Sequence, residues 1–151
     1  MANFKQVSVF FLLISTACFS QEKLKECSLS IKNDNGEKIY VTVEMAQSAQ
    51  ARSKGLMFRK EMDFNKGMLF IFENSKPRSF WMKNTYIALD IAYIDENGII
   101  NEIYTMKPLD YSIVYPSIKP AMFALEVNAG WFKKNNISAG SKIELGGCFS
   151  K

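Results

Sequence analysis

Two Asn-Gly pairs, each lying between two β-prone segments, constrain the fold of this chain more than any other feature. The pairs are Asn35-Gly36 and Asn97-Gly98. Asn and Gly tolerate the positive φ angles that tight hairpin turns require, so each pair predicts a β-hairpin. The flanking segments are residues 28–32 and 38–45 around the first turn, and 90–94 and 99–104 around the second.

The rest of the chain adds more strands and little helix. Ser48 can cap a short helix that ends before Gly55, and a second short helix is expected near Asn128. Residues 105–120 contain Pro108, Pro116 and Pro120 and predict an irregular surface loop. Further strand candidates are residues 67–72, 78–83, 121–127 and 142–145. We therefore expect a mainly β fold, a compact antiparallel barrel or sandwich of about seven to nine strands with two short helices.

The first 20 residues differ from the remainder. A positive charge at Lys5 precedes an apolar run and a region of smaller residues, which is typical of a signal peptide. The apolar run of about eight residues is much shorter than the roughly 20 that span a bilayer. We expect residues 1–20 to be cleaved and residues 21–151 to form one exported domain, periplasmic or secreted, without a transmembrane helix. The alternative is a lipoprotein, in which Cys18 would carry a lipid anchor instead of being removed by ordinary signal-peptide cleavage.

Charge and histidine content narrow the chemistry. The sequence has no histidine, which excludes Ser-His and Cys-His pairs and His-ligated zinc. Without residues 1–20, 18 basic and 15 acidic residues remain with their signs interleaved, so no basic stripe for nucleic acid is present. Met57, Met62, Met68 and Met82 could supply soft ligands to cuprous ion but are better explained as core filler. We expect no cofactor, no metal and no nucleic-acid partner.

Two cysteines lie at opposite ends of the expected domain, Cys27 and Cys148. In an oxidising compartment such a pair favours a disulfide that ties the two ends together, and the alternative is two small buried side chains. In neither case would Cys27 or Cys148 act as a nucleophile.

Three motif regions lie at residues 52–59, 78–91 and 114–130. Over roughly residues 39–145 the chain resembles the family known as domain of unknown function 192, DUF192. The resemblance implies a mostly β domain, often exported, for which no reaction is established. The family's motif positions fall on Arg52, Gly55, Leu56, Met57, Arg59, Phe80, Trp81, Met82, Lys83, Asn84, Leu89, Asp90, Tyr115, Pro116, Leu125, Glu126, Asn128 and Gly130.

Two acidic residues of these motifs, Asp90 and Glu126, are flanked on both sides by apolar residues. A buried carboxylate is costly unless it is paired, and Arg52, Arg59, Arg78 and Lys83 are the available partners. One interpretation is a set of structural ion pairs, and the other is a pocket that recognises a polar or anionic ligand. Trp81 is either an aromatic platform of that pocket or a core residue.

We therefore expect an exported, non-catalytic binding or accessory domain of the cell envelope, with a pocket for a small polar or anionic ligand. An alternative is a carbohydrate-active hydrolase that uses Asp90 and Glu126 as acid and base. A third is a structural module that binds an envelope protein. The expected pocket residues are Arg59, Arg78, Trp81, Met82, Lys83, Asn84, Asp90 and Glu126.

Overall fold

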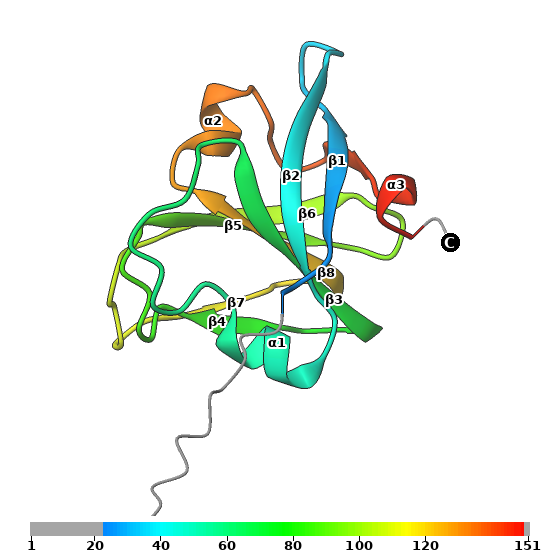
Figure 1. Ribbon diagram of the computed structural model, residues 1–151. Coiled ribbons are helices and arrows are strands. Elements are labelled where there is room, and N and C mark those ends of the chain that lie inside the picture. Colours follow the sequence, from blue (N-terminus) through cyan, green and yellow to red (C-terminus); the bar gives the residue numbers. More distant parts are fainter. Residues whose placement is uncertain (1–22, 150–151) are drawn as a thin grey trace, which may run out of the picture.

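A curled seven-stranded sheet dominates the structure, a computed structural model that describes residues 23–149 (Figure 1). The signal peptide predicted at residues 1–20, with Cys18, lies outside the described residues. The helices are α1 (Ala49–Lys54), α2 (Trp131–Lys134) and α3 (Gly146–Phe149). The strands are β1 (Glu26–Lys32), β2 (Lys38–Ala46), β3 (Lys66–Lys76), β4 (Ser79–Trp81), β5 (Leu89–Ile94), β6 (Ile100–Met106), β7 (Val114–Pro116), β8 (Ala121–Asn128) and β9 (Lys142–Glu144).

The large sheet has the strand order β6-β5-β8-β3-β2-β1-β9, and β4 pairs with β7 in a separate ribbon. All pairs are antiparallel except β2 with β3, which α1 connects. Both predicted hairpins are confirmed, as β1–β2 and β5–β6. Their turn glycines have φ angles of 84° at Gly36 and 81° at Gly98. The predicted mainly β fold is thus confirmed.

The two edges of the large sheet meet at one end. An isolated bridge joins Ile99, beside β6, to Lys142 of β9. The amide of Ile143 donates to the carbonyl of Gly98 at 2.8 Å, and that of Ile100 donates to Ser141 at 3.0 Å. A Cβ atom at Gly98 would lie 2.6 Å from the carbonyl oxygen of Ile143, so the glycine permits this close approach. The sheet is therefore a partly closed barrel.

Each face of the sheet has its own core, because successive side chains of a strand point to opposite faces. Leu69 and Leu125 belong to a core that draws on all seven strands. Phe70 and Ala124, their neighbours in sequence, belong to a second core. That second core lies under α1 and the β4–β7 ribbon, which Figure 1 shows together at one end of the molecule. We call α1, β4 and β7 the outer layer.

Three local features differ from the sequence expectation. A third short helix, α3, follows β9. The loop expected at residues 105–120 contains β7, and β4 is shorter than the strand expected at residues 78–83. β4 and β7 pair only with each other, and they are far apart in sequence. The local residue pattern therefore does not predict this pairing. Within residues 23–149, no helix has the length and apolar character needed to cross a membrane.

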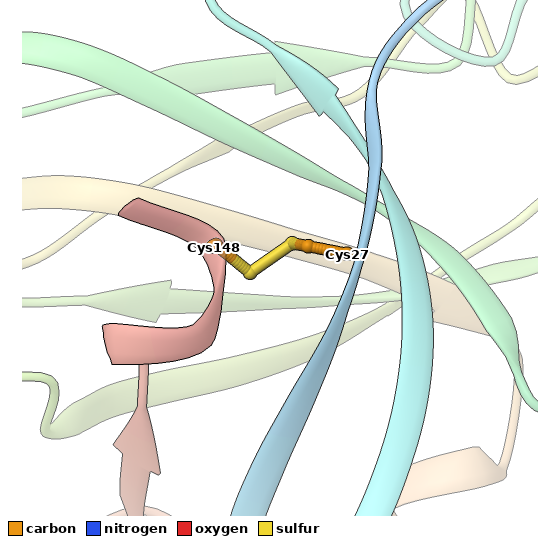
Figure 2. Close-up of a disulfide and its surroundings, with 2 residues drawn as sticks. All are labelled: Cys27 and Cys148. Carbon is orange, nitrogen blue, oxygen red and sulfur yellow. A yellow bond between two sulfur atoms is a disulfide. The ribbon is translucent and has the colours of Figure 1, made fainter. Parts of the chain in front are cut away.

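The disulfide predicted between Cys27 and Cys148 is present in the structure and joins β1 to α3 (Figure 2). The two Cα atoms are 5.2 Å apart, whereas the residues are 121 positions apart in sequence. The bond closes nearly the whole described chain into a single loop. It also fixes the last helix against the first strand.

A Cys148→Ser substitution should lower the free energy of unfolding by about 2 to 4 kcal/mol, because the unfolded chain regains the freedom of a long loop. Urea unfolding measures the loss. The matched variant Cys27→Ser should lose the same amount, and the double variant no more than either one. A double variant that is much less stable than both would contradict a shared bond.

Candidate functional site

A pocket of about 300 Å³ opens between the end of α1 and β4. Its floor is formed by side chains of β3 and β8, on the face of the sheet that the outer layer covers. The lining residues are Arg52, Ser53, Lys54, Gly55, Leu56, Met57, Phe70, Phe72, Ser79, Phe80, Trp81, Thr85 and Glu126.

The α1 wall of this pocket is fixed at both ends. Ser48 caps α1 as predicted, and its side chain accepts the amide of Ala51 at 3.0 Å. Gly55 ends the helix with a φ angle of 49°, and a Cβ atom there would lie 3.3 Å from the ring of Phe70. The guanidinium of Arg52 donates to the carbonyl of Ile71 at 3.0 Å, which ties α1 to β3.

Glu126, on β8, lines the pocket. Its register partners are Met68 on β3 and Ile91 on β5, and only 5% of its surface is exposed. No residue within 23–149 forms a hydrogen bond or ion pair with its carboxyl group. Burial raises the pKa of Glu126 from 4.5 to about 8. The group therefore carries a proton at neutral pH and can both donate and accept a hydrogen bond.

Tyr93, on β5, lies on the same face as Glu126. Burial and then the charge of Glu126 raise the pKa of the Tyr93 phenol. Its hydroxyl donates to the carbonyl of Tyr115 on β7. The phenol thus stays protonated and helps to hold the ribbon on the sheet.

Asp90 has a different environment, although it has the same apolar flanks in sequence. It is 3% exposed and accepts hydrogen bonds from the Thr105 hydroxyl at 2.7 Å and from the Gly130 amide at 2.8 Å. These contacts tie β5 to β6 and to the residue before α2. This geometry supports a structural role for Asp90.

The two carboxylates lie on opposite faces of the sheet. Glu126 is in register with Ile91, whereas Asp90 is in register with Val127. Residues that are directly opposite share a face, and successive residues alternate. A mechanism that needs Asp90 and Glu126 across one cleft does not fit this arrangement.

The cations expected beside these carboxylates have other partners. Arg59 forms an ion pair with Glu44 at 2.6 Å. The guanidinium of Arg78 lies 3.9 Å from the ring centroid of Phe72, and the ammonium of Lys83 lies 5.1 Å from that of Trp81. Among the described residues, no ion pair includes Asp90 or Glu126. The hypothesis of structural ion pairs for these two acids is therefore wrong.

The remaining predicted residues surround the end of β4. Trp81 is 52% exposed at the edge of the pocket, so its interpretation as a core residue is wrong. Met82 is buried in the second core and does not wall the pocket. Asn84 accepts the Tyr111 hydroxyl at 3.3 Å with its side chain and the Phe58 amide at 2.7 Å with its carbonyl.

The structure thus brings two of the predicted pocket residues, Trp81 and Glu126, into one pocket. The others, Arg59, Arg78, Met82, Lys83, Asn84 and Asp90, lie outside its lining. Sequence reasoning missed the contribution of α1 and of the aromatic residues of β3. The predicted helix between Ser48 and Gly55, which overlaps the first motif, was the available signal for the contribution of α1.

Three residues near the pocket adopt left-handed backbone conformations, namely Phe58, Asn84 and Leu109, with φ angles of 66°, 54° and 55°. Two hydrogen bonds connect their turns, from the Phe58 amide to the Asn84 carbonyl at 2.7 Å and from the Leu109 amide to the Thr85 carbonyl at 2.9 Å. This conformation costs a residue with a Cβ atom about 1 to 2 kcal/mol. Phe58 and Leu109 are bulky residues for which it is uncommon.

No metal site is evident in the part of the chain that the structure describes. Within residues 23–149, no three His, Cys, Asp or Glu side chains lie close enough together to hold an ion. Met68 and Met82 are buried in the second core.

A family model for DUF192, described as "Uncharacterized ACR", matches residues 30–145. The chain therefore belongs to the DUF192 family. A protein of Sinorhizobium meliloti 1021, described as a "putative transcription regulator", has a crystal structure similar to this fold. The two share 32% identity with a TM-score of 0.80, over 83% of this chain and 97% of the other.

A second similar crystal structure is that of a protein of unknown function from Novosphingobium aromaticivorans DSM 12444. It is 30% identical with a TM-score of 0.73, over 78% of this chain and 83% of the other. No curated protein matches the chain.

Stability should fall as the pH rises, because of Glu126. Between pH 4.5 and about 8 the unfolded carboxyl is ionised, whereas the folded one keeps its proton. The folded state binds more protons, so stability is greatest below this window and falls through it by about 1 kcal/mol per pH unit. In a Glu126→Gln variant this contribution should be absent. Urea unfolding across the window compares the two, and parallel pH profiles would contradict the assignment.

Proposed function

We propose that this protein is an exported, non-catalytic binding domain of the cell envelope, and that its pocket beside α1 takes a small polar or anionic ligand. Glu126 is the observation that carries the proposal. The Glu126 carboxyl has no protein partner among the described residues and has lost most of its contact with water, which is costly for a polar group. A ligand that completes its hydrogen bonds would remove that cost.

The lining favours a ligand with two different ends. Arg52 and Lys54 bring positive charge to the α1 side, which suits a carboxylate or a phosphate. Glu126, protonated, suits an uncharged hydroxyl, carbonyl or amide group at the floor. Phe70, Phe72, Phe80 and Trp81 supply apolar walls between these ends.

The residues that line the pocket favour a binding role over catalysis. Glu126 is the single carboxylic acid of its lining, and Asp90 lies on the other face of the sheet. The sequence has no histidine to act as a base near neutral pH.

Export is supported by the disulfide and by the N-terminal sequence. A structural disulfide persists in oxidising compartments such as the periplasm and is rare in the cytosol. The predicted signal peptide at residues 1–20 is consistent with that destination.

A thermal-shift screen of the purified protein against small organic acids, sugar phosphates and inorganic phosphate tests the pocket. A compound at about a hundred times its dissociation constant should stabilise the folded state by about 2.7 kcal/mol. A Glu126→Leu variant should bind such a compound at least about tenfold more weakly, because it keeps the side-chain bulk and loses the hydrogen bonds.

Two control variants accompany that test. Glu126→Gln keeps a donor and an acceptor and should bind within a few-fold of the original protein. Glu96→Leu removes an exposed acid from the turn between β5 and β6 and should change nothing. A compound that bound Glu126→Leu as tightly as the original protein, or a screen without any shift, would count against this pocket.

A further inference from the structure

Exposed apolar side chains gather beside the pocket, on the outer layer and the turns that adjoin it. We call this set the aromatic patch. Trp81 and Val114 are register partners on the ribbon, while Phe80 and Tyr115, the next pair, pack into the second core. The members of the aromatic patch are Phe58, Trp81, Tyr86, Leu109, Tyr111 and Val114.

Asn84 connects the turns that carry the aromatic patch. It accepts the backbone amide of Phe58 and the side-chain hydroxyl of Tyr111. The next residue, Thr85, accepts the amide of Leu109 with its carbonyl. These hydrogen bonds hold the turns together, so that their exposed side chains lie on neighbouring segments.

The exposure of this surface is high. Phe58 is 60% exposed and Tyr111 is 59% exposed. Single exposed apolar residues are normal, whereas a contiguous set marks an interaction surface. Phe58 and Leu109 also occupy left-handed positions, for which Gly or Asn is the usual residue. Local backbone preference therefore does not account for a bulky apolar side chain at either place.

Lysines outnumber acids in the segments that carry the aromatic patch. Lys60, Lys83 and Lys107 lie exposed in the three segments that carry it, and none of them forms an ion pair among the described residues. The exposed acid Glu61 directly follows Lys60, and Asp110 accepts hydrogen bonds from the amide and hydroxyl of Ser112. The surface therefore combines aromatic rings with three exposed lysines and two acids.

We infer that the aromatic patch binds an anionic lipid surface. Trp and Tyr prefer the interface between water and lipid, where an apolar ring and a polar atom are both accommodated. Nearby lysines are attracted to anionic headgroups. The inference rests on the proposed location in the cell envelope and is independent of what the pocket binds.

The two tryptophans of the chain allow a direct test. Trp81 belongs to the aromatic patch, whereas Trp131 is fully buried. Vesicles of equimolar phosphatidylglycerol and phosphatidylcholine should shift the tryptophan emission of the purified protein to shorter wavelength. A Trp81→Phe variant should lose the shift. Phosphatidylcholine alone, or added salt, should weaken it.

Two substitutions remove apolar side chains without disturbing the turns. Asn tolerates the left-handed conformation, so a Phe58→Asn/Leu109→Asn double variant should fold, which urea unfolding verifies. Its affinity for the anionic vesicles should fall at least about tenfold. Tyr40→Asn, which removes an exposed aromatic ring from β2 outside the aromatic patch, should have no effect.

Three results would overturn the inference. One is an emission spectrum that anionic vesicles do not change. Another is vesicle binding that the double variant retains in full. The third is a dimer in solution that the double variant abolishes, which would assign the surface to a second copy of the chain. The Glu126→Leu variant should keep its vesicle binding, so failure of the pocket and failure of the aromatic patch can be distinguished.

Discussion

The pairing of β3 with β8 is the contact on which the rest of the structure depends. These strands lie in the middle of the sheet and are covered on both faces, with Leu69 and Leu125 in one core and Phe70 and Ala124 in the other. A Cβ atom at Gly67 would lie 2.4 Å from the carbonyl oxygen of Glu126, so glycine is needed for the strands to approach at this point. The same contact fixes Glu126 at the centre of the covered face.

Features that depend on neighbouring residues could be predicted from the sequence. The two Asn-Gly hairpins and the helix capped by Ser48 are confirmed for this reason, and the disulfide is present because the chain offers Cys27 one partner in the described domain. The site could be predicted only in part. Asp90 and Glu126 have equivalent apolar flanks, yet strand register places them on opposite faces. Register between β5 and β8 is a long-range property that residue pattern alone does not determine.

The partners of the cations near the outer layer also could not be predicted from the sequence. Arg78 and Lys83 lie over the rings of Phe72 and Trp81 and form no ion pair with a buried acid. Burial lowers the pKa of the Arg78 guanidinium, so its place over Phe72 carries a desolvation cost. This arrangement leaves Glu126 without a counter-charge and explains why burial governs its protonation.

Because Cys148 lies near the C-terminus, the disulfide can form only after nearly the whole chain has been made. A chain that is synthesised from its N-terminus presents Cys27 long before Cys148, which lies 121 residues later. Closure of the sheet between β6 and β9 also waits for these final residues. Until Cys148 is available, Cys27 is a thiol without its partner and can exchange with an existing disulfide, forming a mixed disulfide and releasing a thiol. Completion of this fold therefore requires the whole chain through Cys148.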